Sequence, residues 1–154
     1  MDELFPPGVI GFPVTPFNQD CSLDLTGFAK NLEIILSKPF TAFVAAGGTG
    51  ELYSLARDEY LSVIRSAVEK TDGTMPIIAG VGYGSHIAQI MASEAEKIGA
   101  SAILVLPPYY SNACFDGVLA YLKGIGQATS LPLILYTRDW LQINSDEAER
   151  LADE

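Results

Sequence analysis

The sequence has little of what disulfide, metal and nucleic-acid sites require. Only one histidine and two cysteines occur in 154 residues. Cys21 and Cys114 lie far apart without CxxC spacing, so the pattern supports neither a disulfide framework nor a zinc site. Nine Lys and Arg residues face 19 acidic ones, for a net charge of -10. This argues against a nucleic-acid partner, because phosphate contacts need clustered positive side chains.

Long hydrophobic runs are also absent. No apolar stretch approaches the ~18 residues of a membrane span. The N-terminus, MDELFPPGVIGF, lacks a basic region followed by a long apolar run. We therefore expect a cytoplasmic protein with no membrane partner, and we expect neither a metal nor another cofactor.

What the sequence does contain is an alternation of short apolar runs and amphipathic stretches. The apolar runs predict strands of a parallel sheet, buried on both faces, at 9–17, 41–46, 76–81, 102–107 and 132–136. Helical spacing of apolar residues predicts helices within 25–36, 60–68, 87–98 and 115–125. We expect residues 1–154 to form one domain, truncated within a fifth helix that begins at SDEAERLADE.

Four small residues mark predicted helix ends. Ser54, Ser85 and Ser145 are the predicted N-caps, because a serine hydroxyl can accept a hydrogen bond from a free N–H group at a helix start. Gly99 is suited to the left-handed turn that ends a helix.

Five βα units are compatible with two architectures. A doubly wound open sheet can be built from five strands, whereas a (β/α)8 barrel requires three more units than are present. Length alone favours the open sheet, and periodicity does not separate the two. In both, the groups that bind ligands lie at the carboxyl ends of the strands.

The stretch AAGGTGELYSL, residues 45–55, is the strongest candidate for a binding loop. Glycine tolerates positive φ and lets bare N–H groups approach an anion, and the Thr49 hydroxyl adds a donor. Gly47, Gly48 and Gly50 with Thr49 could thus hold a carboxylate or phosphate. No Lys follows as in a Walker loop, and Glu51 would repel a polyphosphate, so a small carboxylate fits better. A tight turn without a ligand is the equally weighted alternative.

The other loops carry weaker signals. GVGYGS, residues 80–85, has Ser85 where a dinucleotide-binding loop needs glycine, so we interpret it as a packed turn. Tyr136 is either a core aromatic or a phenol directed into a site. Arg138 could clamp a carboxylate or pair with Asp139. None of the five lysines lies at the carboxyl end of a predicted strand.

The stretches FPVTPF, GGTGE, PIIAGVG, LPPYY and LILYTRD occur in this order with one in each βα unit. Together they resemble the dihydrodipicolinate synthase / N-acetylneuraminate lyase family over nearly the whole chain. FPVTPF, AAGGTGELYSL and the YxRD pattern are most similar to the branch that dehydrates 5-dehydro-4-deoxyglucarate. The resemblance implies a TIM (β/α)8 barrel, of which this chain covers about the first five βα units, and so reverses the preference from length.

The resemblance also implies roles for individual residues. The Gly47–Gly50 loop would bind the carboxylate of an α-keto sugar acid, with Gly48 and Thr49 in contact. Tyr136 would relay protons, and Arg138 would recognise a second carboxylate. Tyr110 matches a position that reaches a neighbouring subunit, so a homo-oligomer is expected for the intact barrel. The family's imine-forming lysine stands at the end of strand six, beyond this sequence, so the chain alone is expected to be inactive.

Two alternatives remain at this stage. One is an aldolase or synthase of the same family that uses pyruvate. The other is a self-contained five-stranded α/β domain that binds small carboxylates without catalysis.

Overall fold

Strands and helices alternate along the chain as predicted. The computed structural model describes residues 7–108, 112–138 and 141–152. The strands are β1 (Val9–Gly11), β2 (Phe40–Ala45), β3 (Ile77–Val81), β4 (Ala102–Val105) and β5 (Leu133–Leu135). The α-helices are α1 (Leu25–Leu36), α2 (Arg57–Thr71), α3 (Ser85–Ile98), α4 (Phe115–Gly126) and α5 (Ser145–Ala152), and a 3-10 turn, η1 (Leu52–Ser54), precedes α2. None of the described helices is long and apolar enough to cross a lipid bilayer.

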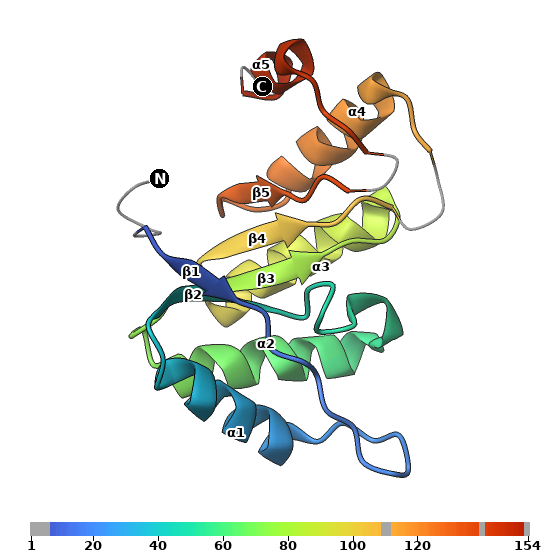
Figure 1. Cartoon of the computed structure of the whole chain (residues 1–154). Helices are drawn as coiled ribbons and strands as arrows, with labels where there is room; N and C mark the ends of the chain where they lie inside the picture. Colours follow the sequence, from blue (N-terminus) through green and yellow to red (C-terminus); the bar gives the residue numbers. More distant parts are fainter. Residues whose placement is uncertain (1–6, 109–111, 139–140, 153–154) are drawn as a thin grey trace.

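The five strands form one parallel sheet in the order β1-β2-β3-β4-β5. Each strand thus pairs with its sequence neighbours, as Figure 1 shows. A doubly wound sheet reverses its order at a switch point and carries helices on both faces. The order found here is that of half a (β/α)8 barrel. The open sheet that length favoured is therefore wrong, and the barrel architecture is confirmed.

Helices α1 to α4 cover one face of this sheet (Figure 1). The main core lies between them and the strand residues that point outward from the barrel axis. Phe28 and Leu32 of α1 and Ile64 of α2 are fully buried there against Phe43 of β2. Because successive strand residues point to opposite faces, every second strand residue belongs to this core.

The other face of the sheet is the concave one, which faces the barrel axis. Its cluster consists of strand residues only: Ala42, Val44, Ile78, Ala102 and Leu104, with Ile134 packed against them. These residues alternate with those of the main core, as a barrel interior requires.

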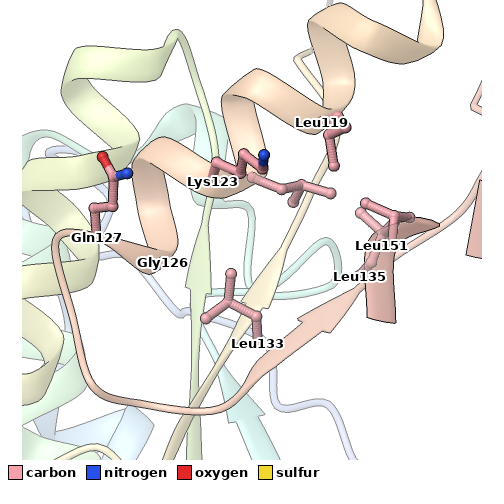
Figure 2. A pocket seen from close by; sticks show the side chains of 8 residues that line it. Leu119, Lys123, Gly126, Gln127, Leu133, Leu135 and Leu151 are labelled. Carbon is pink, nitrogen blue, oxygen red and sulfur yellow. The ribbon is translucent and has the colours of Figure 1, made fainter. Parts of the chain in front are cut away.

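Both edges of the sheet expose apolar groups. Val9, on β1, is 62% exposed, and Val14, which follows that strand, is 53% exposed. Beside β5, the described residues leave a groove of about 540 Å3 between α4, β5 and α5, lined by Leu119, Leu122, Lys123, Gly126, Gln127, Leu133, Leu135 and Leu151. Figure 2 shows the leucine side chains of this groove facing one another across it. Helix α5 is joined to α4 by an ion pair between Arg150, in the last turn of α5, and Asp116, in the first turn of α4 (2.9 Å).

The serine caps predicted from sequence are wrong by one or two residues. Ser54 ends η1, and Ser85 and Ser145 are the first residues of their helices rather than the caps before them. At the start of α5 the cap is Asn144, whose Oδ1 accepts a hydrogen bond from the Glu147 N–H (2.9 Å). A cap needs non-helical backbone, which the neighbouring residues adopt instead.

The carboxylate of Glu96 ties the end of α3 to the turn before β5. Helix α3 ends at Gly99 (φ 106°), as predicted. Glu96 accepts hydrogen bonds from the Thr129 hydroxyl (2.8 Å), the Ser130 N–H (3.2 Å) and the Ser130 hydroxyl. These bonds, the one from the Ser130 hydroxyl first, lower the pKa of Glu96 below its ordinary value of 4.5.

This link predicts a pH dependence of stability. A carboxylate whose pKa falls on folding stabilises the fold above its unfolded pKa, here 4.5, and loses that contribution as pH falls through the lower folded pKa. Between about pH 6 and about pH 3, urea denaturation should show a larger fall in the free energy of unfolding for the wild type than for Glu96→Gln. Glu69→Gln, at an exposed position on α2, is the control. Equal falls in the wild type and Glu96→Gln would contradict the prediction.

Candidate functional site

The carboxyl ends of all five strands lie at one edge of the sheet, because the strands are parallel. Five loops meet this edge, at 12–24, 46–56, 82–84, 106–114 and 136–144. Residues 109–111 and 139–140 of the last two loops lie outside the described residues, and with them the predicted interface residue Tyr110.

The glycines of the 47–50 loop do not adopt the positive φ that glycine tolerates. Its left-handed residues are Ala46 (φ 51°) and Glu51 (φ 55°), which flank the loop, and none of the glycines between them is left-handed. Gly47 and Gly50 serve close packing instead. A Cβ on Gly47 would lie 2.8 Å from Val44 Cγ1, and one on Gly50 would lie 3.0 Å from the Cα of Ala46. At positions 47 and 50 the loop therefore needs glycine for space rather than for positive φ.

The middle of this loop is open to a ligand. Gly48 and Thr49 are exposed, and a Cβ on Gly48 would meet nothing within 4 Å. The turn is closed by the N–H groups of Glu51 and Leu52, which donate to the carbonyls of Gly48 and Gly47 (both 3.1 Å). Within the described residues, the N–H groups of Gly48 and Thr49 have no acceptor. Exposed N–H groups of this kind can donate to an anion.

Thr15 anchors the loop, and its role was missed in the sequence. Its hydroxyl donates to the carbonyl of Gly50 (2.7 Å), and the side chain is only 6% exposed. The bond joins the loop after β1 to the loop after β2, across 35 residues of chain. The available signal was a threonine in the FPVTPF stretch shortly after β1, with Pro13 before it and Pro16 after it.

Gly80 shows why the GVGYGS stretch is rich in glycine. A Cβ on Gly80 would lie 1.9 Å from the Ala46 carbonyl oxygen. Ala46, the left-handed residue just before the glycine loop, thus packs directly against Gly80 of β3. This contact agrees with the interpretation of GVGYGS as a packed turn.

Tyr136 follows β5 on the concave face. Its N–H donates to the Val105 carbonyl (3.0 Å), which extends the ladder with β4 by one residue. Because side chains alternate along a strand, Tyr136 shares the face of Ile134, which packs in the concave cluster. Tyr136 is 39% exposed, so it is not a core aromatic.

Arg138, two residues later, is exposed. Its charge is close enough to Tyr53 to contribute, as a minor cause, to the pKa of that phenol. Asp139, the alternative partner considered from sequence, lies outside the described residues.

All five lysines lie in described segments and away from the carboxyl edge. Lys30, Lys70, Lys97 and Lys123 are on α1 to α4, and Lys38 precedes β2 at the opposite edge. Lys70 is also paired with Glu33 (2.6 Å). None of the five lysines therefore lies at the strand ends, as predicted.

Two tyrosines connect the loops and were also missed in the sequence. The Tyr53 hydroxyl donates to the Pro107 carbonyl (2.8 Å), and the Tyr83 hydroxyl donates to the Leu52 carbonyl (2.9 Å). Their rings meet edge to face, with centroids 4.9 Å apart. Burial raises the pKa of both phenols.

The hollows found among the described residues lie outside the glycine loop, although one of them includes Pro107 and Leu141 of the loops at this edge. Besides the groove at β5, a cavity of about 250 Å3 is lined by residues that include Ser85, Pro107, Tyr121 and Leu135. Leu135 alternates with Ile134, so this cavity lies on the helix-covered face of the sheet. Neither hollow is lined by the Gly47–Gly50 loop or Tyr136. The candidate site is the open concave edge.

Similarity to known proteins agrees with this geometry. The sequence pattern of the dihydrodipicolinate synthetase family matches residues 6–153. A probable 5-dehydro-4-deoxyglucarate dehydratase of Bradyrhizobium diazoefficiens is 38% identical over 153 residues, which are 99% of this chain and 49% of that protein. A protein of the same name from Xanthomonas campestris pv. campestris is 40% identical and covered to 50%. The chain thus spans about half the length of the curated relatives it matches.

Solved structures give the same result for the fold. The dihydrodipicolinate synthase of Aquifex aeolicus superposes with a TM-score of 0.89 at 30% identity, over 96% of this chain and 51% of that one. The enzyme of Acinetobacter baumannii, in complex with pyruvate, has a TM-score of 0.89 at 33% identity, over 95% of this chain and 52% of that one. The match over residues 6–153 and the shared half-barrel architecture show that the chain belongs to the dihydrodipicolinate synthetase family.

Proposed function

We propose that this chain supplies the carboxylate-binding part of a lyase that converts 5-dehydro-4-deoxyglucarate to 2,5-dioxopentanoate. The observation that carries the proposal is the open Gly47–Gly50 loop, whose Gly48 and Thr49 N–H groups have no acceptor among the described residues. The names of the relatives from Bradyrhizobium and Xanthomonas support this choice of substrate. The lyase works only with a further segment that brings the imine-forming lysine and the rest of the barrel.

In this proposal the two ends of the substrate are bound by different loops. The carboxylate beside the ketone accepts hydrogen bonds from the Gly48 and Thr49 N–H groups and the Thr49 hydroxyl. Arg138 binds the second carboxylate, which a guanidinium can hold through two parallel bonds. A site that reads both charges selects a diacid over pyruvate.

The chemistry follows from an imine between the ketone and the lysine. The protonated imine makes the adjacent C–H acidic, and a base removes that proton. The hydroxyl on the next carbon takes up a proton and leaves as water, which gives a conjugated iminium. This iminium accepts the electron pair of the bond to the second carboxylate, and CO2 departs. The resulting enol–dienamine takes up one proton on carbon, and its enol becomes the aldehyde of the product. Hydrolysis of the imine releases the product, so one water and one CO2 leave the substrate. Tyr136, on the concave face, carries the protons.

The test uses the protein as its native source makes it. Incubation with 5-dehydro-4-deoxyglucarate should release CO2 and 2,5-dioxopentanoate in equal amounts, followed by mass spectrometry and gas analysis. Incubation with pyruvate and an aldehyde should give no condensation product. If condensation occurs and dehydration does not, the chain belongs to an aldolase or synthase. If neither occurs, the catalytic proposal is wrong and carboxylate binding alone remains.

A further inference from the structure

We propose that Tyr53 and Tyr83 are positioning residues that lock the loops after β2, β3 and β4 together and hold the Gly47–Gly50 loop in its open conformation. The consequence for ligand binding rests on the proposed function. The effect of the two tyrosines on the loop conformation does not rest on the proposed function, because it concerns this chain without a ligand.

The two phenols make a continuous link across three loops. Tyr83, in the loop after β3, donates to the carbonyl of Leu52, in the segment after β2 (2.9 Å). Tyr53, in that same segment, donates to the carbonyl of Pro107, in the loop after β4 (2.8 Å). The edge-to-face contact of the rings, with an interplanar angle of 71°, joins the two bonds into one unit.

Leu52 connects this unit to the glycine loop. Its carbonyl accepts the Tyr83 hydroxyl, while its N–H donates to the carbonyl of Gly47 (3.1 Å) and so closes the turn. Leu52 is buried, so water does not replace these bonds. A movement of Tyr83 would therefore be transmitted through one residue to the first glycine of the loop.

The backbone at Tyr83 is strained in order to place its ring. Tyr83 has φ 69°, in the left-handed region that a bulky side chain rarely adopts. Such a conformation persists only where the surrounding contacts determine it, and strain of this kind gathers at functional sites. Here the contacts that determine it are the hydrogen bond to Leu52 and the ring of Tyr53.

Gly82 provides the space for this arrangement. A Cβ at that position would lie 2.9 Å from the Tyr53 hydroxyl oxygen and 3.0 Å from Leu52 Cδ2. Because residue 82 has no side chain, the Tyr53 hydroxyl and the Leu52 side chain can approach the backbone of the loop after β3. The second glycine of GVGYGS therefore serves the tyrosine pair, as the first, Gly80, serves Ala46.

The test compares Tyr53→Phe and Tyr83→Phe, which keep the rings and remove one donor each. Tyr60→Phe is the matched control, since Tyr60 is buried in α2 and its hydroxyl has no hydrogen-bond partner among the described residues. Two quantities are measured: amide hydrogen exchange of Glu51 and Leu52 without ligand, and the Kd for pyruvate, followed by NMR shifts of Gly48 and Thr49. Each loop variant should exchange about 3- to 10-fold faster and bind pyruvate weaker by a similar factor, as expected for one lost hydrogen bond. Tyr60→Phe should change neither.

The two readouts separate the two proposals. If exchange at Glu51 and Leu52 is the same in the loop variants as in Tyr60→Phe, the positioning role is wrong. If exchange rises while pyruvate binds the variants as tightly as the wild type, the tyrosines hold the loop, but the proposed consequence for ligand binding is wrong. If the wild type binds neither pyruvate nor 5-dehydro-4-deoxyglucarate, the proposed function fails, and the exchange rates alone decide whether the tyrosines hold the loop.

Discussion

Borohydride reduction in the presence of pyruvate is expected to leave the mass of this 154-residue chain unchanged. The reason is positional: every lysine lies on a helix or before β2, and none is at the carboxyl edge where Gly48, Thr49 and Tyr136 lie. An imine at the site therefore needs an amine from outside the chain. Intact-mass spectrometry before and after reduction measures this directly.

The matched experiment supplies the missing amine. Residues 1–154 are joined to the unmatched half of the Xanthomonas campestris relative, of which this chain covers 50%. This chimera should gain one reduced pyruvyl group, at a lysine that peptide mapping places in the added half. A Thr49→Val chimera should gain less, since the loop loses a donor. A site-specific adduct on residues 1–154 alone would contradict the proposal that the lysine is external.

Gly80→Ala is expected to destabilise the fold by about 3 kcal/mol, a large effect for a single methyl group. The added Cβ would lie 1.9 Å from the carbonyl oxygen of Ala46. That oxygen belongs to the backbone and cannot rotate away as a side chain would. Relief requires Ala46 to leave its left-handed conformation, which would also displace the glycine loop. Urea denaturation gives the loss in free energy, and pyruvate binding should be lost with it.

Gly84→Ala is the control for this substitution. Gly84 stands four residues later in the same stretch, is exposed, and would place a Cβ with nothing within 4 Å. Its φ of -74° suits alanine. The change should stay within about 0.5 kcal/mol. If both alanines cost the same, the contact between Ala46 and Gly80 does not determine the stability of this edge.

The elements of the fold could be predicted because their signals are local. Five apolar runs and four amphipathic stretches predicted the strands and helices, because the spacing of apolar residues reflects burial on one or both faces. The helix starts were less accessible. Ser85 and Asn144 are both polar residues near a helix start, and only the backbone conformation decides which neighbour is the cap.

The architecture and the site depend on contacts between distant residues, which periodicity does not encode. A βα unit looks the same in an open sheet and in a barrel, so the motifs of the family, rather than the spacing, identified the barrel. Thr15 and Gly50 are 35 residues apart, and Tyr83 and Leu52 are 31 apart. Their roles appear only when the strands lie side by side. Positive φ at Ala46 and Glu51 also had no signal, because neither is a residue type that favours it.

The strand order bears on how the chain forms during synthesis. Each strand pairs with the one made just before it, from β1 to β5, so no strand waits for a distant segment. Each pairing closes a loop of about 30 residues rather than one that spans the whole chain, which limits the chain entropy lost before each contact is gained. The glycine loop, its Thr15 anchor and the two tyrosines can therefore all assemble on the ribosome once β4 has emerged. The edge formed by these loops would then already be in place before β5 joins the sheet.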